Sequence, residues 1–284
     1  MNKNSVTSRL RNKSKETGVN YQTLQAFFFY ESFLNLLAES PYNENFILKG
    51  GLLVSALTGI INRGTVDIDF LMRNQQMNED TISKIITAVT ASADTDSVYF
   101  ELNKIEPIRE NDEYGGLRAH LCGRLANIRQ PFYIDIATGD PVTPEAEILD
   151  YHTIFGEIIR IKSYPIETIL TEKLQTILVL ADANGRSKDF YDIYILSKLE
   201  KSEIRTDQFH TAVQRTFEYR KSSLPDEYDA LHIIDRIQND ASCNRRWSLY
   251  AKKSPYAAGV SFEDTTTACK QLLKQLYSYN GRKQ

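Results

Sequence analysis

Apolar positions in the first quarter of the chain change their spacing repeatedly, and each spacing predicts a different element. Between residues 21 and 38 they recur three and four positions apart and include several phenylalanines, which predicts a buried amphipathic helix. Residues 46–48 form a short apolar run that predicts a strand leading into a Gly-Gly turn. A helix is expected over 52–60, and residues 65–71 then alternate apolar and polar side chains with the period of a strand.

The next part of the chain continues this mixture of strands and helices. We expect a helix over 79–91 and further strands over 97–105, 118–125 and 132–136. The mixture predicts an α/β (α+β) core built on a mixed sheet.

After residue 161 the pattern becomes helical. Helices are expected over 165–180 and 188–198, and the remainder of the chain predicts helices interrupted at Pro225 and Pro255. We therefore place a boundary near residue 163. It separates a core domain with N-terminal helices (residues 1–163) from a mainly α-helical C-terminal domain (residues 164–284).

Composition excludes several classes of protein. The 284 residues are 42% hydrophobic and 25% charged, as in ordinary globular proteins. The three cysteines are isolated from one another and from any histidine at metal-ligand spacing, which argues against a disulfide framework and a structural zinc site. No apolar run is long enough for a signal peptide or a membrane span, so we expect a cytoplasmic protein without membrane contact.

The charge balance adds little about partners. With a net charge of -3, contact with nucleic acid would require a local basic patch. The clearest asymmetry is at the start, where five basic residues precede Glu16; they are Lys3, Arg9, Arg11, Lys13 and Lys15. Such a run is more often a solvated leader than a binding arm, and we interpret it as a leader.

The strand predicted over 65–71 carries the first candidate chemistry. Asp67 and Asp69 are two residues apart, so on a strand they project from the same face and can share a hard cation such as Mg²⁺. A solvated strand face would explain the pair alone equally well. The glycine turn and helix that precede the pair favour the metal site.

Gly50-Gly51 is the second feature. Glycine allows the backbone to approach a ligand closely, and the helix that follows presents free N–H groups that can bind the phosphates of an NTP. Taken by itself, a glycine pair more often marks a tight turn between a strand and a helix.

Asp135 is the third feature, a carboxylate between apolar residues in the strand predicted over 132–136. A buried carboxylate needs a partner or a metal, and a third ligand would complete a two-metal site for in-line displacement at phosphorus. An exposed aspartate on an edge strand explains this stretch equally well.

Four blocks together resemble the AbiEii/AbiGii toxin family of nucleotidyltransferases, within the DNA polymerase β-like superfamily. They are Phe46-Ile-Leu-Lys-Gly-Gly-Leu52, Arg63-Gly-Thr-Val-Asp-Ile-Asp-Phe-Leu71, Glu172-Lys-Leu174 and Arg186-Ser-Lys-Asp-Phe-Tyr-Asp192. The resemblance implies a nucleotidyltransferase core followed by a helical domain. It also implies that Asp67 and Asp69 bind metal and that the helical domain contributes Lys173 and Asp192 to the cleft as catalytic residues.

The family pattern suggests roles for further residues. Lys173 suits the neutralisation of triphosphate charge, although a surface lysine paired with an acid is its simpler interpretation. Arg186, with Lys188, is assigned to phosphate or nucleic-acid contact, whereas a salt-bridged helix start explains that segment equally well. Arg63 and Thr65 would orient the triphosphate or only hold their loop. One departure is Gly51, which stands where polymerase β-like enzymes usually have serine, so a hydroxyl contact to the nucleotide is missing.

The resemblance implies a toxin of an abortive-infection (phage defence) toxin-antitoxin system. Such a toxin would use Mg²⁺ to transfer a nucleoside monophosphate from an NTP to an RNA acceptor, with the tRNA 3′ end as the expected target, and so inhibit growth. A cognate antitoxin is expected, with no direct complex required. Two alternatives are nucleotidylation or phosphorylation of proteins, including self-modification, and NTP binding without turnover.

Overall fold

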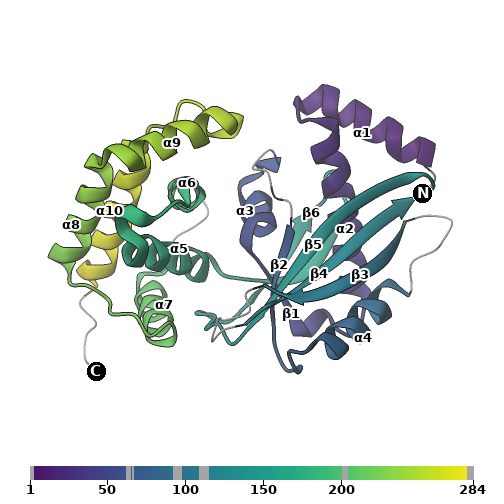
Figure 1. The fold of residues 1–284 in the computed structure, drawn as a ribbon, viewed down its shortest axis with the longest axis horizontal. Coiled ribbons are helices and arrows are strands. Elements are labelled where there is room, and N and C mark those ends of the chain that lie inside the picture. The colour runs from purple at the N-terminus through teal and green to yellow at the C-terminus, as the bar shows by residue number, and fades with distance from the viewer. Residues whose placement is uncertain are drawn as a thin grey trace. The chain divides into compact units, whose positions relative to one another are not determined.

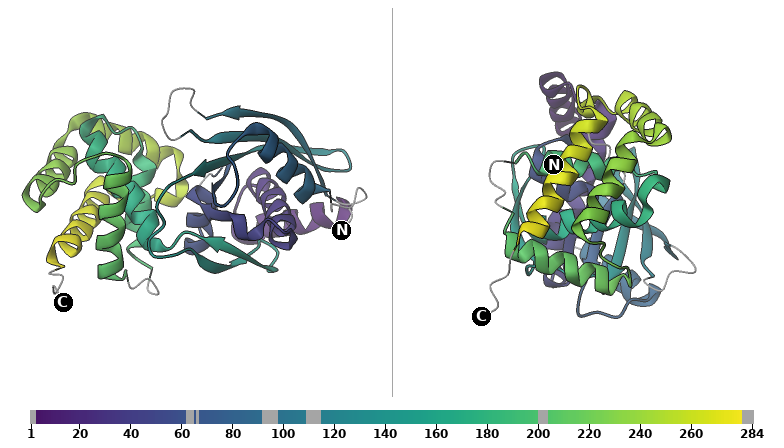
Figure 2. Two further views of the ribbon diagram at one scale, coloured as in Figure 1. Left: turned by 90° about the horizontal axis from the view of Figure 1, so that it is seen from below. Right: turned by 90° about the vertical axis from the view of Figure 1, so that its left-hand side faces the viewer.

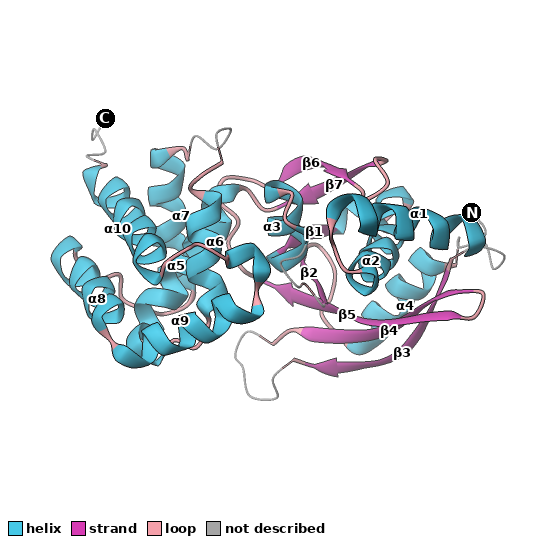
Figure 3. Ribbon diagram, turned by 90° about the horizontal axis from the view of Figure 1, so that it is seen from above, coloured by secondary structure: helices cyan, strands magenta, loops and turns pink. Residues whose placement is uncertain are grey.

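The computed structural model describes residues 3–61, 65, 67–91, 98–108, 115–199 and 204–279. The chain divides into two units, drawn together in Figure 1. Unit 1 comprises Met1–Gly139 and Glu147–Ser163, and unit 2 comprises Asp140–Ala146 and Tyr164–Gln284. The division assigns the short segment Asp140–Ala146, which lies before the predicted boundary, to the helical part of the chain. Figure 3 shows the strands in unit 1 and helices and loops in the described part of unit 2.

Unit 1 contains a seven-stranded sheet with the order β3-β4-β5-β2-β1-β7-β6. Strands β2 and β5 pair in parallel, as do β1 and β7, and the other neighbours are antiparallel. The sheet is therefore mixed, as the sequence predicted. The strands are β1 Phe46–Lys49, β2 Asp67–Met72, β3 Tyr99–Pro107, β4 Leu117–Leu125, β5 Ile128–Thr138, β6 Glu147–His152 and β7 Ile158–Ser163.

Aromatic side chains of α2 (Tyr21–Glu39) pack on one face of this sheet. The Phe33 ring lies 5.8 Å from the Phe100 ring of β3 and 6.4 Å from the Phe132 ring of β5, centroid to centroid. Helix α4 (Glu79–Thr90) packs against α2 and β3. The phenylalanine-rich helix predicted from the sequence is thus part of the core, and its contacts assign one face of the sheet to the interior.

Three parts of unit 1 differ from the sequence-based expectation. Residues Lys3–Thr17 form helix α1, which buries Val6 and Leu10, instead of a solvated leader. Strand β5 is longer at both ends than the apolar run that predicted it. The hairpin of β6 and β7 was not expected, because only Tyr151 of β6 and alternate residues of β7 are buried.

Unit 2 consists of helices in its described part. Helix α10, yellow in Figure 2, packs against α6, α7 and α8. Its start is fixed by a capping box between Ser261 and Asp264. None of the described helices is long and apolar enough to cross a membrane. The six helices are α5 Ile166–Leu180, α6 Ser187–Leu196, α7 Thr206–Tyr219, α8 Glu227–Asn239, α9 Ala241–Lys253 and α10 Phe262–Ser278.

Glu31 of α2 is a carboxyl group buried in the core of unit 1. It accepts hydrogen bonds from the Tyr151 hydroxyl (3.1 Å) and the Ile154 backbone N–H (3.0 Å), which tie the β6–β7 hairpin to α2. Burial raises its pKa to about 8, although these hydrogen bonds oppose the shift. The folded protein therefore retains a proton at Glu31 that the unfolded chain releases near pH 4.5.

The stability of the protein is expected to fall as pH rises from about 5 to about 8, because the unfolded chain binds fewer protons than the folded one in this range. Glu31→Gln removes this titration, so its urea-unfolding midpoint should fall less between pH 6 and pH 9 than that of the wild type. Circular dichroism gives both midpoints. Glu39→Gln, which alters an exposed carboxylate of the same helix, serves as the control. Equal falls for wild type and Glu31→Gln would contradict the assignment.

Candidate active site

Three carboxylates lie together on strands β2 and β5. In the parallel register Asp69 is opposite Asp135 and Asp67 is opposite Tyr133, so the three acidic side chains project from one face of the sheet. One carboxylate oxygen from each of Asp67, Asp69 and Asp135 lies within 4.8 Å of the other two. The intervening residues of these strands, including Ile68 and Ile134, are buried on the opposite face. Side chains alternate between the two faces along each strand, and the pairing of β2 with β5 therefore brings the three acids together.

The electrostatics of this acidic cluster favour a bound cation. The pKa of Asp69 is raised to about 6, chiefly by burial and also by the charges of Asp67 and Asp135. The Lys49 charge and a hydrogen bond from the Gly51 backbone oppose the shift. A divalent ion offsets such crowding of negative charge, and carboxylate oxygens are the ligands that Mg²⁺ prefers.

Gly50 and Gly51 adjoin this cluster at the start of helix α3 (Gly50–Thr58). Gly50 has a φ of +66°, and a Cβ atom at this position would lie 2.0 Å from Asp69 Oδ2. Both the backbone conformation and the close approach require glycine. The Gly51 N–H donates to Asp69 Oδ2 at 3.3 Å. The glycine pair thus seats the α3 N-terminus directly against a carboxylate of the cluster.

Asp135 has a partner that the sequence did not reveal. Arg118 of β4 is paired with it in the antiparallel register and donates from Nε to Oδ1 (2.7 Å) and from Nη2 to Oδ2 (2.6 Å). The bidentate bond fixes the carboxylate plane, and each oxygen retains a lone pair for another ligand. The two residues are 17 positions apart, so only strand pairing, which the sequence did not specify, brings them together.

The remaining candidates near β2 are Arg63 and Thr65. Arg63 lies outside the described residues. Thr65 is buried, and its Oγ1 has no hydrogen-bond partner within the described part of the chain. A buried hydroxyl without a partner two residues before Asp67 can donate to a ligand.

In unit 2, Lys173 of α5 is held between two acids of α6. Its Nζ lies 2.5 Å from Asp192 Oδ2 and 3.2 Å from Asp189 Oδ1. The Lys173 side chain is 14% exposed, and Asp192 is fully buried. Lys173 is therefore not a surface lysine in this structure. Arg186, at the start of α6, pairs through Nε with Asp189 Oδ2 at 2.8 Å, so the salt-bridged helix start considered from the sequence is present.

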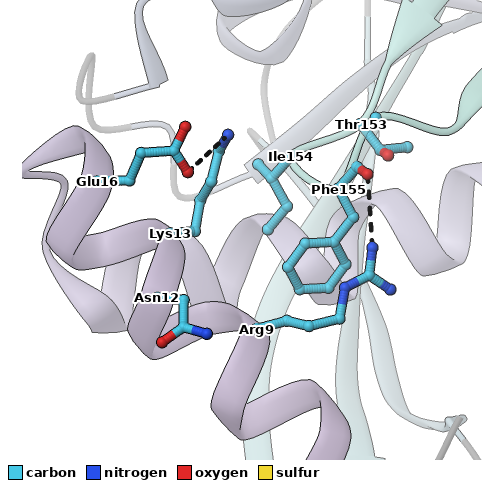
Figure 4. A pocket seen from close by; sticks show the side chains of 8 residues that line it. Arg9, Asn12, Lys13, Glu16, Thr153, Ile154 and Phe155 are labelled. Atoms are coloured by element: carbon cyan, nitrogen blue, oxygen red, sulfur yellow. Dashed lines mark hydrogen bonds and ion pairs between the residues drawn. The ribbon is translucent and has the colours of Figure 1, made fainter.

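One pocket of about 350 Å³ lies between α1 and the β6–β7 turn. Its walls include Arg9, whose guanidinium lies 3.9 Å from the centroid of the Phe155 ring (Figure 4). Lys13 pairs with Glu16 beside it. No residue of the acidic cluster lines this pocket.

Comparison with known families decides the identity of the chain. The family model described as "Nucleotidyl transferase AbiEii toxin, Type IV TA system" matches residues 32–266, which is most of the chain. The chain belongs to the AbiEii family. This membership makes it a toxin-type nucleotidyltransferase, and the type IV toxin-antitoxin system implies an antitoxin partner.

Two solved structures resemble the AbiEii-family chain. One, from H. pylori, is described as a "putative nucleotidyltransferase"; it is 16% identical, the match covers 92% of this chain and 96% of that one, and the TM-score is 0.48. The other is JHP933 from Helicobacter pylori, 14% identical, with coverages of 92% and 94% and a TM-score of 0.47. No curated protein sequence matches the chain.

The AbiEii-family assignment agrees with the chemistry of the acidic cluster. Nucleotidyltransferases normally use a divalent metal, and Asp67, Asp69 and Asp135 form a donor set that can hold one. Arg118 and Lys49 are the cationic neighbours that moderate its negative charge.

Proposed function

We propose that this AbiEii-family chain transfers a nucleoside monophosphate from an NTP to the 3′ end of an RNA, with tRNA as the acceptor, and that this transfer inhibits growth. The cluster of Asp67, Asp69 and Asp135 beside the N-terminus of α3 carries the proposal. It supports metal-assisted chemistry at a phosphate, because cation ligands and the N-terminus of a helix, which attracts anions, adjoin each other.

Each candidate site residue of unit 1 has a distinct part in this proposal. The three aspartates hold Mg²⁺, which when bound neutralises charge on the triphosphate and on the attacking oxygen. The N-terminus of α3 receives the β- and γ-phosphates, because a helix N-terminus carries partial positive charge. Thr65 donates to the nucleotide its hydroxyl, which has no hydrogen-bond partner among the described residues. Arg63 is retained as a nucleotide contact on the family pattern alone.

In unit 2 we propose Lys173 and Asp192 as residues required for activity, with Arg186 as a nucleotide contact. The burial of Lys173 and Asp192 in one ion-pair network supports a requirement beyond surface charge, because Lys173 Nζ is oriented by two acids. The second acid, Asp189, also pairs with Arg186 and so couples this residue to the network.

The purified full-length protein, incubated with each labelled NTP and with total RNA and protein from a lysate, tests the proposal. We expect label in small RNA in the presence of Mg²⁺ and none when the ion is chelated, with recovery after Mg²⁺ is restored. Label in protein Ser, Thr or Tyr residues instead would show protein nucleotidylation. Binding of Mg²⁺ and NTP without transfer to either fraction would show a binding module.

A further inference from the structure

The face of strands β3, β4 and β5 that lies opposite α2 continues the acidic cluster away from α3. Residues directly opposite each other in a sheet share a face, and the register gives two such rows. One row joins Asp69 to Asp135 and Arg118, and the next joins Asp67 to Tyr133 and His120. This surface is polar, whereas α2 covers the opposite face.

Tyr133 is an exposed aromatic ring in the middle of this surface. Tyr133 is 37% exposed, so part of its ring is open to a ligand. The Arg118 guanidinium carbon lies 5.0 Å from the ring centroid, and the His120 ring lies 4.7 Å away, centroid to centroid, at 74° to the Tyr133 ring. His120 is held in turn by Glu106 at 2.6 Å. The ring is therefore fixed by its neighbours and still accessible for stacking.

Beyond the acidic cluster this face carries basic as well as acidic side chains. The register places four Lys or Arg side chains of β3, β4 and β5 on the face and two glutamates; they are Lys104, Arg118, Arg124, Arg129, Glu101 and Glu106. Arg124 pairs with Glu101 at 2.7 Å and Lys104 with Glu106 at 2.6 Å. Arg118 pairs with Asp135, so three carboxylates face the four basic groups and the excess is one basic group. This surplus of positive charge next to an exposed aromatic ring complements a nucleic-acid strand, in which phosphates alternate with bases.

The direction of the reaction points to the same surface. In the proposed transfer a bond forms between the acceptor oxygen and the α-phosphorus, and the bond from this phosphorus to the bridging oxygen of the β-phosphate breaks. Pyrophosphate leaves, and the hydroxyl proton passes to water. Attack is in line, so the acceptor approaches from the side opposite the leaving group. With the β- and γ-phosphates at the N-terminus of α3 beside β1, the acceptor lies over β5 and β4.

We infer that the β4–β5 surface binds the terminal nucleotides of the RNA acceptor; this surface comprises Arg118, His120, Arg124, Arg129 and Tyr133. The inference rests on the proposed function and identifies where its acceptor binds. The Tyr133 ring stacks on a base, and Arg124 and Arg129 face the phosphates. Arg118 is a positioning residue, because it contacts both Asp135 and the Tyr133 ring and so sets the ring relative to the acidic cluster.

Steady-state transfer by the full chain, with labelled NTP and a single RNA preparation, tests this surface. Loss of one stacking contact weakens RNA binding by roughly tenfold, so Tyr133→Ala should raise the KM for RNA by about that factor and leave the KM for NTP within about twofold. Tyr133→Phe keeps the ring and should restore most of the RNA affinity. Tyr228→Ala removes a tyrosine that is 77% exposed on α8 and is the matched control.

Fluorescence anisotropy with a 5′-labelled single-stranded RNA gives a second reading without turnover. The dissociation constant should rise for Tyr133→Ala and for Arg129→Gln and stay at the wild-type value for Tyr228→Ala. If the wild type labels RNA and Tyr133→Ala has an unchanged KM for RNA, the inference about this surface is wrong and the proposed function stands. Absence of RNA labelling by the wild type would overturn both.

Discussion

Asp69→Asn is expected to reduce nucleotide transfer by about a thousandfold, while the folded protein becomes no less stable. The substitution removes a charged ligand from the acidic cluster, and the loss of one charge-stabilising group at a reaction centre costs a factor of this order. The amide oxygen of asparagine can still accept the Gly51 N–H, so the local backbone is retained. Label transfer to RNA and growth after induced expression measure the loss, and Asp150→Asn, at an exposed carboxylate of β6, is the control.

The stability part of this prediction follows from the pKa of Asp69, which lies at about 6 instead of 3.8. A raised pKa means that the folded protein opposes ionisation, so the wild type loses stability as pH rises from about 4 to about 6. At pH 8 and in the presence of a chelator, Asp69→Asn should therefore unfold at the same temperature as the wild type or higher. A lower unfolding temperature would mean that Asp69 is a structural residue and would remove the basis of the activity assignment.

The sequence predicted the acidic cluster because the information is local. Alternation over residues 65–71 fixed the common direction of Asp67 and Asp69, and the apolar neighbours of Asp135 marked it as a carboxylate on a sheet. Neither strand by itself predicted that β2 and β5 would pair in parallel, with Asp69 opposite Asp135. Register depends on the whole set of strand neighbours, and the sequence offered no signal for β6 and β7, which complete the sheet.

Cross-strand partners were missed for the same reason. Arg118 and Tyr133 stand in separate strands, and neither carries a motif, so their contact with each other and with Asp135 appears only once the register is known. The basic N-terminal segment was misinterpreted for a different reason, because a local signal for its structure was present in the sequence. Its charges predicted a leader, whereas burial of Val6 and Leu10, four positions apart on α1, decides that it is a packed helix. Two well-spaced apolar residues were the available signal.

Asp192→Ala is expected to destabilise unit 2 by about 3–5 kcal/mol, the usual cost of leaving one charge of a buried pair without its partner. Asp192 is fully buried, and its carboxylate lies 2.5 Å from Lys173 Nζ. Asp189 is shared between Lys173 and Arg186, so after the loss of Asp192 it neutralises the Lys173 charge only in part. The single tryptophan of the chain, Trp247, is buried in unit 2, and its fluorescence reports unfolding of this unit in urea. Arg236→Met, which breaks a half-exposed pair with Asp182, should cost no more than about 1 kcal/mol.

The double variant Lys173→Met/Asp192→Leu separates structure from chemistry at this pair. Apolar side chains of similar volume can replace a buried ion pair at little or no cost, so the double variant should unfold close to the wild type. Asp189 keeps Arg186 as its partner. If Lys173 is needed for the reaction, the refolded double variant remains inactive in label transfer, because the lysine charge that would act on the triphosphate is gone. Recovery of both stability and transfer would instead show that the pair serves only to hold α5 against α6.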